Sequence, residues 1–114
     1  MSNENLPVIP VSVTIAEEGG AYKATFSPSP TVIDTASVLN YSLATEGWAF
    51  ETVTFSAPFS DLETISPTEF NITDNGGAVD TTDSFSVVII QTDVHRGAAA
   101  QIDSDPEVLN GPHG

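Results

Sequence analysis

The chain has 114 residues, the length of one domain, and its sixteen carboxylates against two cationic side chains give a net charge of −14. This charge repels phosphates, so it disfavours nucleic acid and anionic membrane surfaces as partners and favours cations or basic proteins. Cysteine is absent, which excludes disulfides, thiolate metal sites and thiol nucleophiles.

The apolar residues occur in short runs separated by polar turns, which predicts a folded chain with one core. The first ten residues have no basic start and no apolar run of signal-peptide length, and no segment approaches the roughly 20 apolar residues of a membrane span. We therefore expect a soluble cytoplasmic protein, with a flexible tail over residues 1–7 and a single β-sandwich domain over residues 8–112.

Apolar residues at every second position predict a first strand over residues 8–16 and a second around residues 22–26. The Gly19-Gly20 pair between them supplies the positive φ angles of a tight hairpin. Pro28 and Pro30 then end the second strand, because proline lacks an amide donor and restricts the residue before it.

The same alternation predicts a third strand over residues 39–43, and residues 45–47 have the composition of a short hairpin loop. A fourth strand follows over residues 48–55. Within it the apolar phase slips between Phe50 and Val53, as an inserted β-bulge residue would cause. We expect Tyr41 and Trp48, from these two strands, to anchor the core.

Proline and aspartate predict a loop over residues 58–67, followed by a brief fifth strand at Phe70 and Ile72. Residues 84–92 are apolar at both parities and rich in β-branched side chains, which is typical of a strand in the middle of a sheet. We expect this sixth strand to be the most buried. Residues 102–108 predict a weaker seventh strand that Asp105-Pro106 interrupts.

About seven short segments with turn signals between them, and no helical spacing, predict an all-β fold. The architecture that fits best is a two-layer antiparallel β-sandwich of immunoglobulin-like kind.

Four parts of the chain resemble the DP-EP family of small uncharacterised bacterial proteins. They are Tyr41-Ser42-Leu43, Gly47-Trp48-Ala49-Phe50, the strand over residues 85–92, and the terminal Asp105-Pro106-Glu107-Val108 with Asn110 and Pro112. The resemblance covers roughly residues 10–112. The Asp-Pro dipeptide is present, and the Glu-Pro dipeptide is not. Membership implies a β-sandwich of unknown function and supplies no catalytic residue or ligand.

Two acidic clusters are candidate calcium sites, because β-sandwich modules collect oxygen ligands from loops at one end. Their residues are Asp74, Asp80 and Asp83 in one loop, and Asp103, Asp105 and Glu107 near the C-terminus. Neither cluster matches an EF-hand. The alternative is that these are solvated loop acids, some of which cap turns.

The sequence gives little support to an enzymatic function, because only His95 and His113 could serve as a base and no nucleophile motif accompanies them. Arg96 is expected to pair with a nearby acid. Trp48 could stack on a sugar, but a tryptophan at an inward position is more often part of the core.

The sequence therefore favours a non-enzymatic structural or protein-interaction module that requires no cofactor. Sheet edges invite pairing, so we expect a protein partner or self-association into a homo-oligomer, with neither nucleic acid nor membrane as a partner. The alternative is a calcium- or carbohydrate-binding module that uses the acidic loops.

Overall fold

A computed structural model of the protein describes residues 6–29, 31–92 and 100–111. This part of the chain is all-β and contains no helix, so none of its segments is a helix that could cross a membrane. The strands in chain order are β1 (Val8–Glu18), β2 (Ala21–Ser27), β3 (Thr31–Ile33), β4 (Ser37–Leu43), β5 (Trp48–Thr54), β6 (Phe59–Ser66), β7 (Glu69–Asp74), β8 (Thr82–Ser84), β9 (Ser86–Gln91), β10 (Gln101–Ser104) and β11 (Glu107–Asn110).

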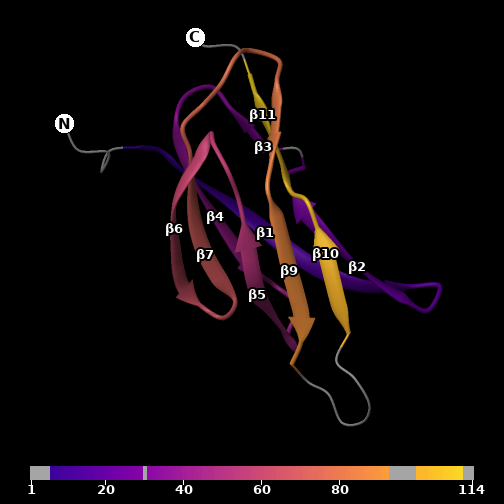
Figure 1. Cartoon of the computed structure of the whole chain (residues 1–114). Helices are drawn as coiled ribbons and strands as arrows, with labels where there is room; N and C mark the ends of the chain where they lie inside the picture. Colours follow the sequence, from indigo (N-terminus) through magenta and orange to yellow (C-terminus); the bar gives the residue numbers. More distant parts are fainter. Residues whose placement is uncertain (1–5, 30, 93–99, 112–114) are drawn as a thin grey trace.

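The strands form three sheets, with the orders β2-β1-β4-β7-β6, β10-β9-β5 and β3-β11-β8 (Figure 1). The prediction of a wholly antiparallel arrangement is wrong, because β1 pairs parallel with β4 and β3 pairs parallel with β11. The β1–β2 hairpin reverses the chain once. A second reversal before β4 restores the original direction, so β4 runs parallel to β1 where the two strands pair.

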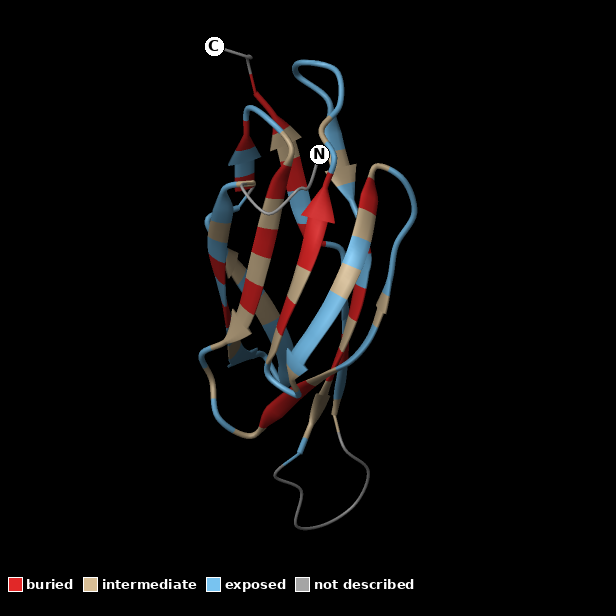
Figure 2. Ribbon diagram, turned by 90° about the vertical axis from the view of Figure 1, so that its left-hand side faces the viewer, coloured by how far each residue is buried: buried red, intermediate tan, exposed pale blue. Residues whose placement is uncertain are grey.

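One core fills the space between the five-stranded sheet and the β10-β9-β5 sheet. The two sheets contact each other through aromatic rings: Phe50 of β5 packs against Phe70 of β7 with ring centroids 4.8 Å apart, and Tyr22 of β2 packs against Trp48 of β5 at 5.0 Å. Tyr41 and Trp48 are buried, at 1% and 6% exposure, as predicted. Figure 2 shows buried bands alternating with lighter ones along the strands, the sign of one inward face.

Several predicted strands are confirmed. The first two strands form the predicted hairpin, with φ of +60° at Gly19 and +86° at Gly20. The pairing of β5 with β9 shifts between Phe50 and Thr52, where the apolar phase predicted a bulge. β9 lies in the middle of its sheet, as predicted.

Other predictions about strands are wrong. Residues 45–47 do not close a hairpin, because β4 and β5 belong to different sheets. The loop predicted over residues 58–67 contains strand β6. β9 is not the most buried strand, because β4 and β7 in the middle of the five-stranded sheet have no exposed residue, whereas Ser86 of β9 is exposed and Val88 and Ile90 are half-buried.

Candidate functional site

One end of the core is polar. Asp74 is the last residue of β7, Asp83 lies in β8 and Asn110 is the last residue of β11. Each occupies the core-facing parity of its strand, two residues from a buried Ile72, Phe85 or Val108 respectively. The three side chains therefore extend into the interior from three strands that are far apart in sequence.

The side-chain amide of Asn110 connects this end of the core. Its Nδ2 donates to Oδ2 of Asp83 at 2.8 Å, to Oγ1 of Thr81 at 3.1 Å and to the backbone oxygen of Thr81 at 3.2 Å. Asp74 accepts a hydrogen bond of 2.8 Å at Oδ1 from the amide of Gly76. A Cβ at Gly77 would lie 3.1 Å from Nδ2 of Asn110, so glycine lets the loop close over the amide.

Three buried polar atoms at or near this end have no hydrogen-bond partner among the described residues: Oδ2 of Asp74, Oδ1 of Asn110 and the hydroxyl of Tyr41. Asp74 is 0% exposed and Asn110 is 1% exposed. Each such atom costs free energy in a low-dielectric interior, because the water it contacted in the unfolded chain is not replaced. We refer to Asp74, Asp83 and Asn110 together as the polar end of the core.

Burial raises the pKa of Asp74 from 3.8 to about 6. The amide of Gly76 lowers this pKa, whereas the nearby carboxyl group of Asp83 raises it. Burial also raises the pKa of Tyr41, and the charge of Asp74 raises it further.

The predicted loop cluster is partly assembled by the fold. Asp74 and Asp83 come together, and the interpretation of Asp74 as a solvated loop acid is wrong because its side chain is buried. Asp80 is exposed in a left-handed conformation, with φ of +67°, and takes part through its backbone amide, which donates to the oxygen of Asn110.

The second predicted cluster lies along an exposed face. Asp103, Asp105 and Glu107 are all exposed and follow one another at every second position through β10 and β11. Successive residues on one face of a strand are about 7 Å apart, which spreads the carboxylates rather than gathering them. Within the described residues, no group of three or more histidines, cysteines or acids is placed to hold a metal ion.

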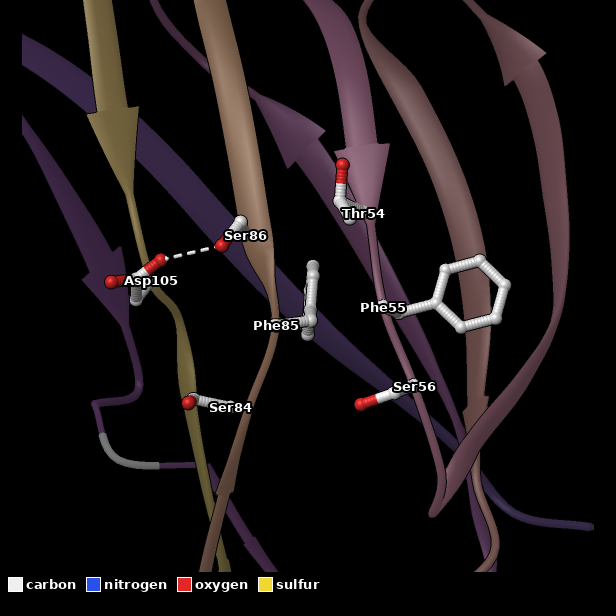
Figure 3. Close-up of a pocket in the computed structure, with 7 residues that line it drawn as sticks. All are labelled: Thr54, Phe55, Ser56, Ser84, Phe85, Ser86 and Asp105. Carbon is white, nitrogen blue, oxygen red and sulfur yellow. Dashed lines mark hydrogen bonds between the residues drawn. The ribbon is translucent and has the colours of Figure 1, made fainter.

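Asp105 instead marks a junction between strands. β8 pairs with β11 and β9 pairs with β10 in the same register, so the second strand pair continues the first. Between the two pairs, where the backbone pairing is interrupted, Phe85 lies opposite Pro106. Proline has no amide proton to donate, which explains the break. Beside it, Asp105 accepts a 3.0 Å hydrogen bond from the hydroxyl of Ser86 (Figure 3).

A shallow cleft of about 320 Å³ lies at this junction, where β5 and β8 diverge. Its lining residues are Thr54, Phe55, Ser56, Ser84, Phe85, Ser86 and Asp105. Figure 3 shows the ring of Phe55 pointing away from Asp105 and Phe85. The cleft therefore offers hydroxyl groups and one carboxylate, without an aromatic ring presented for stacking. Trp48 is buried against Tyr22, which agrees with its predicted place in the core rather than with the alternative of sugar stacking.

His95, Arg96 and His113 lie outside the described residues, so their predicted roles stay predictions. Asn110 was not predicted from the sequence as a site residue. The signal that could have found it is its parity with Val108, which places an amide at a core-facing position of a strand.

No model of a known protein family matches the chain, and no curated protein matches it either. The resemblance to the DP-EP family therefore stays a prediction.

Proposed function

We propose that the protein is a non-enzymatic interaction module, an acidic β-sandwich of immunoglobulin-like kind that pairs with a second copy of itself through strand β2. The observation that supports this most directly is the character of β2 as an edge. It is the outermost strand of the five-stranded sheet, and all seven of its residues pair with β1 without a register shift.

The other edge strands of the described part are poorer templates for pairing. β6 has two register shifts and carries Asp61 and Glu63, and β5 has a bulge and Glu51. β10 has only four residues, including Asp103, and β3 and β8 have three residues each. Bulges, charges and short length are the features by which natural edges avoid pairing. β2 has seven residues and no bulge, its one charged residue is Lys23, and it contains no acid in a chain that has sixteen.

The free backbone groups of β2 can be assigned from the hairpin. A two-residue turn closes on a hydrogen-bonded pair, here Glu18 with Ala21, and bonded and non-bonded pairs then alternate. Ile15 and Ala24 therefore form a non-bonded pair. The amide of Ile15 accordingly points away from β2, where it donates to Oγ1 of Thr45 at 2.9 Å. By the same alternation the amides of Tyr22, Ala24 and Phe26 point outward.

These outward groups are self-complementary. An antiparallel pairing of two β2 strands about Ala24 places Tyr22 of one copy opposite Phe26 of the other, and Lys23 opposite Thr25. No like charges face each other across such a pair, and the aromatic pair adds a favourable cross-strand contact. The tip of the β1–β2 hairpin projects beyond the other described strands, while part of β2 contacts β10, so a second copy would approach β2 from the tip (Figure 1). The interface is isologous, which closes the assembly at a dimer.

The net charge of −14 opposes any self-association and makes it depend on salt. We therefore expect the dimer to form at high sodium chloride concentration and to weaken as the salt is diluted. Pairing through β2 adds little to this charge repulsion, because the strand brings Lys23 rather than carboxylates into the contact.

Sedimentation equilibrium of the full chain across salt concentrations tests the proposal. The Ala24→Pro variant removes an outward amide proton without removing a hydrogen bond to β1, so it should be monomeric at every salt concentration. Thr25→Ala changes the next side chain and keeps the backbone, so it should dimerise like the wild type. A wild-type protein that stays monomeric at all salts, or an Ala24→Pro protein that still dimerises, contradicts the proposal.

A further inference from the structure

We propose that the polar end of the core binds one calcium ion between Asp74, Asp83 and Asn110. This site is independent of pairing through β2, because β1 and β4 separate β2 from β7 in the sheet. It also differs from the cluster predicted from sequence, since an amide oxygen from the last strand replaces the carboxylate of Asp80.

The ligand atoms are those that remain unpaired in the fold. Oδ2 of Asp74 and Oδ1 of Asn110 are buried, lie on core-facing side chains and accept no hydrogen bond from a described residue. The carboxyl group of Asp83 is adjacent to both residues, because it accepts from Nδ2 of Asn110 and raises the pKa of Asp74. A cation stabilises unpaired buried acceptors of this kind, because its positive charge attracts their oxygen atoms.

The protein supplies no cation of its own at this position in its described part. Lys23 is the one lysine or arginine among the described residues, and it lies on β2 at the far edge of the sheet. Two neighbouring carboxylates in a partly buried environment repel each other unless a proton or a cation lies between them. The arrangement therefore favours a bound positive ion at neutral pH.

Calcium fits the chemistry of these groups. It takes six to eight oxygen ligands in flexible geometry, drawn from carboxylates, amide and backbone carbonyls and water. The site offers two carboxylates and an amide oxygen, and the carbonyl and hydroxyl of Thr81 lie within hydrogen-bond distance of Asn110. Magnesium requires a stricter octahedron and retains its water, so a site formed by three separate strands suits it less well.

Thermal melts of the full chain in calcium chloride and in magnesium chloride test the site, because the two salts match in valence and ionic strength. A ligand that binds only the folded state raises the melting temperature with its concentration. We expect calcium to raise it by about 5 °C more than magnesium at saturation. Titration calorimetry should then show one calcium ion per chain.

The variants separate this site from general screening of charge. Asp74→Asn keeps the shape and can still accept the hydrogen bond from Gly76, and it should abolish the difference between calcium and magnesium. Asp80→Asn removes one charge from the same loop at a left-handed position that asparagine tolerates, and it should keep the full difference. Equal melting temperatures in the two salts for the wild type, or a calcium effect that persists in Asp74→Asn, overturns the proposal.

Discussion

The side-chain amide of Asn110 donates a 2.8 Å hydrogen bond to Oδ2 of Asp83, across 27 positions of the sequence. This bond connects the end of β11 to the strand that precedes the β9 core strand. It also brings the buried amide close to Asp74, whose carboxyl group interacts with Asp83. The stability of the fold and the ionisation of Asp74 are therefore linked.

The first prediction concerns the pH dependence of stability in calcium-free buffer. The pKa of Asp74 is raised from 3.8 to about 6, so its protonated form is favoured in the folded chain. The resulting stability is fully present below about pH 4 and is lost as the pH rises through about 6. Converted in full to a free energy of unfolding, this pKa shift corresponds to about 3 kcal/mol. Solvent at the exposed loop beside Asp74 screens the interaction, so we expect about 2 kcal/mol.

Denaturant unfolding of the wild type and Asp74→Asn measures this contribution. The variant should be more stable than the wild type by about 2 kcal/mol at about pH 8, and the two should converge at about pH 4. Asp83 and Tyr41 are the titratable groups that interact with Asp74, and both remain in the variant. A constant difference between the two proteins across this range would contradict the raised pKa.

The second prediction concerns the hydroxyl of Tyr41. The side chain is 1% exposed, its ring stacks on Phe70 with centroids 5.1 Å apart, and its hydroxyl has no hydrogen-bond partner among the described residues. Tyr41→Phe keeps the ring contacts and removes the buried polar atom, so it should stabilise the protein by about 1 kcal/mol. Denaturant midpoints with unchanged slopes provide the measurement. A loss of stability of that size would show that the hydroxyl has a partner.

The third prediction concerns the hairpin that sets the register of β2. Gly20 has a φ of +86°, a conformation that is strained for residues with a Cβ, so Gly20→Ala should destabilise the chain by about 1 kcal/mol. Gly19 has a φ of +60°, which asparagine adopts readily, and Gly19→Asn should leave the stability equal or slightly higher. Equal losses in the two variants would contradict a turn with these conformations.

The limits of prediction are visible in particular strands. Regular alternation predicted β1, β2 and β4, because each has at least seven residues and apolar side chains at every second position. β6 has two register shifts in its pairing with β7, so its apolar residues lose the period of two and look like a loop. β3 and β8 have only three residues each, too few for a period to be recognised.

The residues of the candidate site also differ in whether the sequence could predict them. Asp74 and Asp83 were visible as acids of one loop, because they are close in sequence. Asn110 was not, since its position beside Asp83 depends on the pairing of β11 with β8. Burial of Asp74 follows from the packing of the sheets, and no local pattern distinguishes it from the exposed Asp80.

The sequence by itself determined the all-β character, the β1–β2 hairpin and the bulge in β5, because these depend on neighbours within a few residues. Only the tertiary structure decided the parallel pairs, the free edge at β2 and the polar end of the core. Strand pairing joins residues that are distant in the chain, and the environment of a carboxyl group is determined by what packs around it. Asp74 and Asp80 are both loop aspartates in the sequence, and only the packing of three strands buries one of them and leaves the other in water.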